Sequence, residues 1–156
     1  MAKVLVVGFG NVLRGDDGLG LRVIKALRPK VDPELVELME FHQLGPELAE
    51  SISKFELVIF VDASMNGASG TIRSRKVLPK LGPRTQSHVV DPAAVLNLAA
   101  NLYGHAPETL IITVTGAFFG YASELSEIAA LAVPAAVENI QQQIAKRFGN
   151  PSAPSA

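Results

Sequence analysis

Two aspartates and one histidine stand at positions where their side chains could share a divalent metal ion. Asp17 lies in a glycine-rich segment, Asp62 directly follows the apolar run 58–61, and His88 lies in a polar loop. Two carboxylate oxygens and one imidazole nitrogen suit borderline ions such as nickel or zinc, and the imidazole disfavours magnesium and calcium. Three protein ligands leave coordination positions open for a substrate. Spacing alone therefore predicts a weak, exchangeable metal site and no particular reaction.

Each of these residues also has an explanation that needs no metal. Asp17, or Asp16 beside it, could cap the helix that follows and interact favourably with its dipole. Asp62 could accept a hydrogen bond within the turn after its strand. His88 could be a solvated loop histidine. For single residues these alternatives stay open, and the metal hypothesis depends on all three side chains meeting.

The glycine-rich segment 8–20 occupies the place of a dinucleotide-binding turn but lacks the corresponding pattern. The third glycine of a G-x-G-x-x-G motif would fall at Leu13, which removes the close approach of helix to strand. Asp16 and Asp17 stand where the helix N-terminus would hold a pyrophosphate, and carboxylates repel phosphates. No Gly-Lys-Ser/Thr sequence follows, which excludes a P-loop. The segment is predicted to favour a cation.

The elements that must position these residues alternate between strands and helices. Helical periodicity begins at Asp17 and stops at Pro29; Asp91 is predicted to cap a second long helix, and Ser123 to begin a third, which Pro134 kinks. A short helix is predicted over 46–53. Buried strands are predicted over residues 4–8, 35–41, 57–61 and 110–114, with an edge strand over 71–78.

This alternation predicts an α/β fold: a three-layer sandwich with a mostly parallel twisted sheet, helices on both faces and room for one antiparallel edge strand. Ligands of such sheets bind beyond the carboxyl ends of the strands. If the first and third strands are neighbours, Asp17 and Asp62 open onto one edge and the loop of His88 can fold over them. Residues 1–148 are predicted to form a single domain and residues 149–156 a disordered tail.

Composition narrows the class of protein further. Fourteen basic residues nearly balance fifteen acidic ones, and no long basic run indicates nucleic-acid binding. The chain has no cysteine, which excludes disulfides, cysteine catalysis and thiolate metal ligands. Neither a signal peptide nor a membrane-spanning apolar stretch is evident. We therefore expect a soluble, cytoplasmic and monomeric protein.

The residues of the first loop also carry a family resemblance. The sequence resembles the NiFe-hydrogenase maturation endopeptidases over roughly residues 1–148. Their first-loop motif, G-x-G-N-x-L-x-x-D-[DE]-G-x-G, is met at every fixed position, namely Gly8, Gly10, Asn11, Leu13, Asp16, Asp17, Gly18 and Gly20. The family's second acidic ligand precedes alanine, as in Asp62-Ala63, and its histidine follows serine, as in Ser87-His88. The segments 42–50 and 116–126 also resemble members of the family.

Two features depart from the pattern of many members. Asp17 stands where many have glutamate, so a metal would sit closer to the backbone or be reached through water. Residues 40–43, Glu-Phe-His-Gln, replace a common Asp-Gly-Gly-Thr. His42 is therefore expected to contact substrate or to lie on the surface, and a fourth metal contact is the alternative.

The resemblance implies an endopeptidase that removes the C-terminal extension of a NiFe-hydrogenase large-subunit precursor after nickel has been loaded. It implies that Asp17, Asp62 and His88 bind the nickel supplied by the substrate, and that the same residues form the catalytic site. Gly10, Asn11 and Asp16 are predicted as the cofactor-binding residues of the loop. Asp16 is expected to lie behind the site or to cap the helix, and Asn11 to orient the loop or to donate a hydrogen bond to the substrate backbone. The alternatives are a non-enzymatic, nickel-dependent assembly adaptor and another metal-assisted hydrolase on the same scaffold.

Overall fold

The computed structural model describes residues 1–80 and 90–152, and the sheet at its centre has the strand order β2-β1-β3-β5-β4. The strands β2 (Val36–Phe41), β1 (Val4–Phe9), β3 (Leu57–Ser64) and β5 (Glu108–Thr115) run parallel. The edge strand β4 (Ile72–Lys76) is antiparallel to β5. The predicted mostly parallel sheet is thus confirmed. Its edge strand is antiparallel, and the first and third strands are neighbours, which is the condition that a shared site of Asp17 and Asp62 required.

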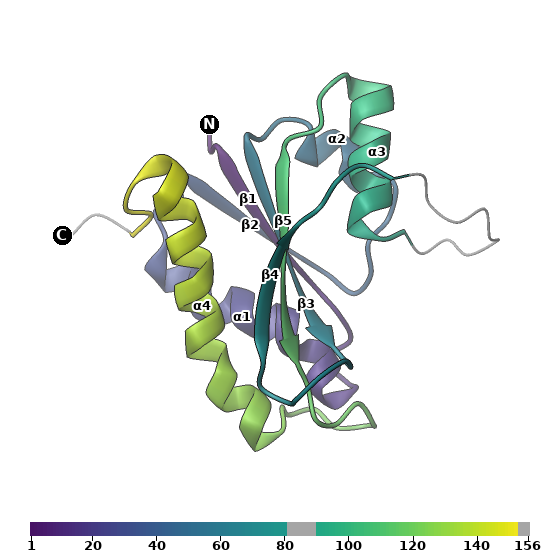
Figure 1. Cartoon of the computed structure of the whole chain (residues 1–156), viewed down its shortest axis with the longest axis vertical. Coiled ribbons are helices and arrows are strands. Elements are labelled where there is room, and N and C mark those ends of the chain that lie inside the picture. The colour runs from purple at the N-terminus through teal and green to yellow at the C-terminus, as the bar shows by residue number, and fades with distance from the viewer. Residues whose placement is uncertain (81–89, 153–156) are drawn as a thin grey trace.

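Helices cover both faces of this sheet, as predicted (Figure 1). The helices α1 (Leu19–Leu27) and α4 (Glu127–Phe148) pack on one face, and α2 (Leu48–Ile52) and α3 (Pro92–Tyr103) on the other. Single 3-10 turns, η1 (Gly15–Gly18) and η2 (Arg28–Lys30), precede and follow α1. Alternate residues of β1 supply the two cores: Val4 and Val6 face α1 and α4, whereas Leu5 and Val7 face α2 and α3.

Two predicted element boundaries are wrong, and one predicted helix cap is confirmed. The strand β3 continues to Ser64, so Asp62 lies within the strand and not after it; its pairing with β5 persists through Ser64↔Thr115. The last helix begins at Glu127, because Ser126 and not Ser123 is its cap and accepts a hydrogen bond from the N–H of Ala129. The predicted cap at Asp91 is confirmed by the N–H of Ala94 at 2.8 Å.

The segment after α4 is described as far as residue 152. Pro151 is buried, and its carbonyl accepts a hydrogen bond of 2.8 Å from the N–H of Asp32. Within the described residues, no helix combines the length and the apolar character needed to cross a bilayer.

Candidate functional site

Glycines of the first loop bring the start of α1 against the carboxyl ends of β1 and β3. A methyl group on Gly20 would lie 2.4 Å from the carbonyl oxygen of Val61, and one on Gly10 would lie 2.0 Å from that of Asp17. Gly10 also has a φ of +146°, which favours glycine. Because the backbones approach this closely, Asp17 is placed beside Asp62, the residue after Val61.

Asp16 turns away from solvent and binds the loop between β5 and α4. Its side chain is fully buried and accepts hydrogen bonds from the N–H groups of Ala117 (2.6 Å) and Phe118 (3.0 Å). Ser126 donates twice, through its N–H at 2.8 Å and its Oγ at 2.6 Å. Burial works to raise the pKa of Asp16, but these hydrogen bonds outweigh it and lower the pKa below its usual value.

Neither aspartate makes a capping hydrogen bond, so that part of the capping alternative is wrong, although both acids lie in the first turn, η1. No side-chain hydrogen bond caps η1 or α1. Asp16 instead connects two loops that are 101 to 110 residues apart in sequence. With its oxygens occupied by protein donors, Asp16 is suited to positioning its neighbour Asp17 and not to direct contact with an ion.

Asp17 and Asp62 form a pair of carboxylates at the carboxyl edge of the sheet. Burial raises the pKa of Asp62 to about 7, and the negative charge of Asp17 adds to the increase against a single opposing hydrogen bond from Ala63. The close approach of Gly20 to Val61 places both acids at this edge of the sheet, near enough for the charge of Asp17 to act on Asp62. The structure therefore brings together two of the three predicted ligands.

One oxygen of each carboxylate is held by the backbone and the other is available. Asp17 Oδ2 accepts from the N–H of Asn11 at 2.8 Å, and Asp62 Oδ1 accepts from the N–H of Ala63 at 2.8 Å. The second oxygens, Asp17 Oδ1 and Asp62 Oδ2, have no hydrogen-bond partner in the part of the chain that the structure describes. The side chain of Asn11 accepts a hydrogen bond of 2.9 Å from the N–H of Leu13 within the same loop, and its predicted role toward the cofactor or substrate stays a prediction.

The third predicted ligand, His88, lies outside the described residues. Within residues 1–80 and 90–152 no three histidine or acidic side chains are clustered closely enough to hold a metal ion. The complete Asp17, Asp62 and His88 set therefore stays a prediction. His42 is exposed and borders a shallow hollow with Gly10 on the β2 side of the loop, and its predicted role also stays open.

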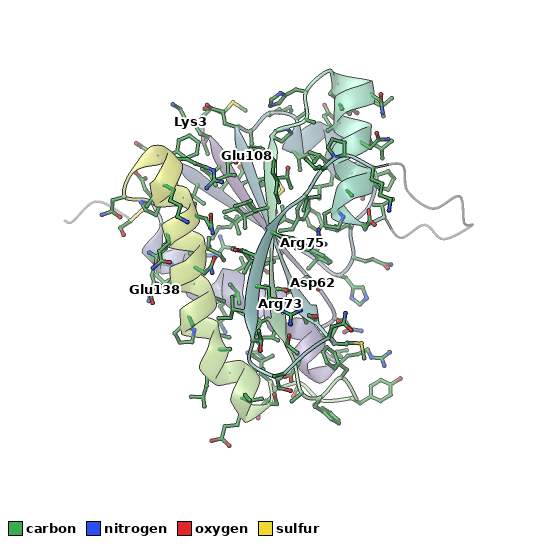
Figure 2. The ribbon with its side chains drawn as sticks, in the orientation of Figure 1. Lys3, Asp62, Arg73, Arg75, Glu108 and Glu138 are labelled. Atoms are coloured by element: carbon green, nitrogen blue, oxygen red, sulfur yellow. The ribbon has the colours of Figure 1, made fainter. Side chains whose placement is uncertain are left out.

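A second polar feature, which the sequence analysis did not single out as a site, lies next to Asp62. Asp62 pairs in register with Thr113 of β5, and Thr113 pairs with Arg73 of β4. Figure 2 shows Asp62, Arg73 and Arg75 in the same part of the molecule, on the face that carries α3. The alternation of arginines in β4 was visible in the sequence, but the strand register that places Arg73 in one row with Asp62 could not be read from it.

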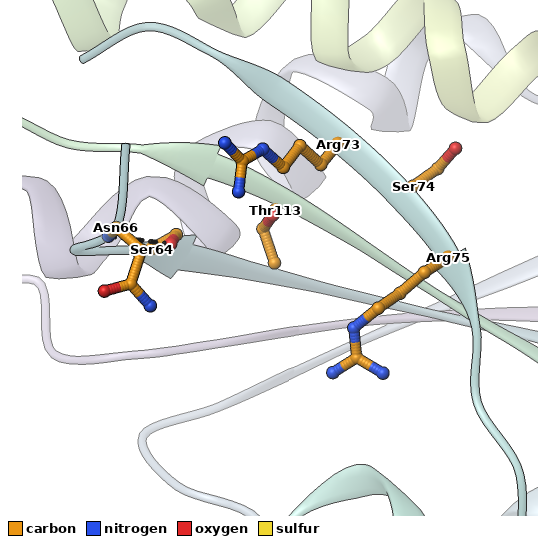
Figure 3. A pocket seen from close by; sticks show the side chains of 6 residues that line it. All are labelled: Ser64, Asn66, Arg73, Ser74, Arg75 and Thr113. Carbon is orange, nitrogen blue, oxygen red and sulfur yellow. Dashed lines mark hydrogen bonds between the residues drawn. The ribbon is translucent and has the colours of Figure 1, made fainter. Parts of the chain in front are cut away.

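These arginines line a hollow of about 530 Å³, which we term the arginine hollow (Figure 3). It has polar walls on three strands and the loop after β3. Its lining consists of Ser64, Asn66, Arg73, Ser74, Arg75 and Thr113. Asp62 does not line the arginine hollow itself, which borders β3 two residues further on, at Ser64, and lies toward the antiparallel edge of the sheet.

The sequence is similar to hydrogenase maturation proteases from other organisms. No protein-family model matches the sequence. A putative hydrogenase maturation protease of Methanocaldococcus jannaschii is 31% identical over 154 residues, which cover 92% of this chain and 97% of that protein. The Hydrogenase 2 maturation protease of Escherichia coli is 29% identical over 116 residues, or 70% of each chain. In four further relatives the matched segment covers 53% to 57% of their length.

Solved structures show the same fold. The hydrogenase maturating endopeptidase HybD from E. coli superimposes with a TM-score of 0.78 at 24% identity, over 95% of this chain and 94% of that one. At this identity the likeness concerns the fold alone. It agrees with the α/β architecture described above.

Proposed function

Since this chain belongs to the hydrogenase maturation proteases, we propose that it removes the C-terminal extension of a nickel-loaded NiFe-hydrogenase large-subunit precursor. In this proposal the substrate brings the nickel, and Asp17, Asp62 and His88 bind that ion. The observation that carries the proposal is the carboxylate pair Asp17 and Asp62 at the carboxyl edge of the sheet.

The state of the two carboxylates supports cation binding. Burial and the charge of Asp17 make the ionised form of Asp62 unfavourable, as its pKa of about 7 reflects. A divalent ion between the two groups removes that repulsion and replaces lost solvation. Each carboxylate also keeps an oxygen free of hydrogen bonds from the described residues. Oxygen ligands with imidazole suit nickel or zinc, and the absence of cysteine keeps the site exchangeable.

An exchangeable site of this kind can test whether the precursor is loaded. When substrate thiolates hold nickel with open coordination positions, the protease residues complete its ligand set, and the ion joins enzyme to substrate. An unloaded precursor lacks this connection and binds weakly. The order of events then follows from binding: nickel insertion precedes removal of the extension.

The test uses the purified protein with nickel-loaded and nickel-free forms of one large-subunit precursor, followed by intact-mass measurement. We expect the loaded precursor to lose its C-terminal peptide and the nickel-free precursor to remain intact. A stable stoichiometric complex with no released peptide would instead establish an assembly adaptor. An intact precursor with no complex would point to another metal-assisted hydrolase.

A further inference from the structure

The arginine hollow offers a positive subsite beside the carboxylate pair. Arg73 and Arg75 are both exposed and stand two residues apart in β4, which places their side chains on the same face of the strand. Figure 3 shows both guanidinium groups on the same side of β4, with Thr113 and the residues Ser64 and Asn66 nearby. Two like charges are thus presented together to an open, polar hollow.

Arg73 and Arg75 have no acidic partner in the part of the chain that the structure describes. No salt bridge joins Arg73 or Arg75 to a carboxylate among residues 1–80 and 90–152. The remaining segments, 81–89 and 153–156, contain no aspartate or glutamate. Lys76 follows on the same strand but on its other face, where its charge acts on Glu108. The balance of charge at β4 therefore favours an anionic group from another molecule.

The distance from Asp62 defines which part of a substrate can reach the arginines. Asp62, Thr113 and Arg73 occupy one row across three adjacent strands. With neighbouring strands about 4.8 Å apart, Arg73 lies roughly 10 Å from Asp62, the span of about three residues of extended peptide. Arg75 lies two residues further along β4. A peptide bound at Asp62 that continues across the sheet thus reaches both arginines within about four residues.

We propose that Arg73 and Arg75 bind a carboxylate of the precursor chain, three or four residues from the scissile bond. This inference rests on the proposed function, because it takes the carboxylate pair as the place of cleavage. A guanidinium forms paired hydrogen bonds with a carboxylate in fixed geometry, which fixes direction as well as position. The arginines therefore set the path of the substrate across the sheet.

Positive charge on an edge strand has another established use, which is protection against edge-to-edge association. The two roles differ in measurable ways. Protection predicts that the variants aggregate and leaves substrate affinity unchanged. Carboxylate binding predicts a salt-sensitive loss of affinity from a monodisperse protein. The experiment below therefore includes both substrate kinetics and light scattering.

The experiment compares the wild type with the double variant Arg73→Gln/Arg75→Gln in processing of a nickel-loaded precursor. We expect KM to rise by about 10-fold, with kcat within about twofold, since the lost contacts are charge-assisted and remote from the reacting bond. The dissociation constant of the precursor should become less dependent on sodium chloride. Lys146→Gln removes one charge from the opposite face, on α4, and serves as the control with unchanged KM.

Substrate variants identify the source of the carboxylate. Changing aspartates and glutamates near the scissile bond to their amides tests side-chain carboxylates, whereas a short neutral C-terminal extension displaces the terminal one. The substrate change that removes the bound carboxylate should raise the KM of the wild type. The same change should have no further effect on the KM of the double variant. Unchanged KM and unchanged salt dependence in the double variant would overturn the subsite but leave the proposed function standing. Failure of the wild type to bind or process the precursor would overturn both.

Discussion

Ser126 donates two hydrogen bonds to the buried carboxylate of Asp16, 110 residues earlier in the chain, through its N–H at 2.8 Å and its Oγ at 2.6 Å. Ser126 is also the cap of α4. The same residue thus begins the last helix and holds the loop that carries Asp17. Because Asp16 and Asp17 are adjacent, the position of the candidate ligand depends on this long-range contact.

Asp16→Asn should destabilise the protein and impair processing. An amide cannot accept hydrogen bonds on both of its ends, so at least one buried donor loses its partner, at a cost on the order of 3 kcal/mol in the free energy of unfolding. Urea denaturation measures this change. Asp17→Asn is the matched control, because its single hydrogen bond from Asn11 can be kept. Equal stability of the two variants would contradict the role assigned to Asp16.

Asp62 should make the metal-free protein less stable as pH rises. Its folded-state pKa of about 7 exceeds the ordinary value of 3.8, so between these values the folded state binds more protons than the unfolded state. The free energy of unfolding therefore falls from about pH 4 to pH 7 and then levels off. Denaturation at several pH values in the presence of a chelator should show this slope for the wild type and a flatter one for Asp62→Asn. Parallel curves would contradict the raised pKa.

Gly20→Ala should displace α1 and reduce both stability and processing. The added methyl group would meet the carbonyl oxygens of Val61 at 2.4 Å and Phe9 at 2.7 Å, and backbone atoms cannot rotate aside. We expect a loss on the order of 3 kcal/mol, in the upper range for overpacking. Gly104→Ala is the control: it adds the same methyl group at a φ of +73° with no atom within 4 Å, and should cost about 1 kcal/mol. Thermal and urea unfolding distinguish the two.

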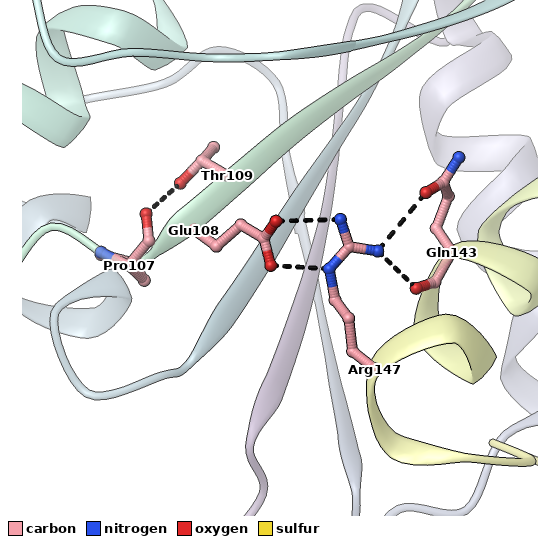
Figure 4. Close-up of polar contacts among 5 residues, drawn as sticks. All are labelled: Pro107, Glu108, Thr109, Gln143 and Arg147. Atoms are coloured by element: carbon pink, nitrogen blue, oxygen red, sulfur yellow. Dashed lines mark hydrogen bonds and ion pairs between the residues drawn. The ribbon is translucent and has the colours of Figure 1, made fainter.

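Arg147→Gln should lower stability modestly and leave processing intact. Figure 4 shows Arg147 of α4 bound to both oxygens of Glu108, at 2.6 Å and 2.9 Å, at the start of β5. This end of the strand is opposite to the one that carries the acids. The pair is partly exposed, so we expect a loss of about 1 kcal/mol that shrinks in high salt. The exposed pair of Lys3 and Glu56, at 3.9 Å, is the control, and Lys3→Gln should have little effect.

Asp17→Ala, Asp62→Ala and His88→Ala should each leave a folded protein that no longer processes the nickel-loaded precursor. Each variant removes one member of the proposed ligand set, and neither Asp17 nor Asp62 is part of either hydrophobic core described above. Circular dichroism checks folding, and intact-mass measurement checks cleavage. His105→Ala should retain cleavage and serves as the histidine control, because His105 contacts the carbonyl of Phe55 near the start of β5, the end of the strand opposite the acids. Full activity in any two of the three ligand variants would remove the metal-site hypothesis.

Local signals were sufficient for most of the fold. Asp91 followed by Pro92 marked the start of α3, and the apolar runs marked β1, β3 and β5. The ends of helices and strands were predicted less accurately where tertiary contacts determine them. The strand β3 continues past Val61 to Ser64 because it pairs with β5 up to that residue. No local sequence pattern predicts this extension. Similarly, Ser126 and not Ser123 begins α4 because Asp16 and Ala129 both bind it.

By itself the sequence determined the class of fold, the glycine loop with its two acids, and the family that the loop motif indicates. These properties depend on residue types and short spacings, which propensity and periodicity encode locally. Only the tertiary structure decided that Asp16 turns inward while Asp17 and Asp62 come to the same edge of the sheet, and that Arg73 lies in one row with Asp62 through Thr113. The physical reason is that burial, hydrogen-bond partners and strand register join residues that are far apart in the chain, and only the folded chain brings them together.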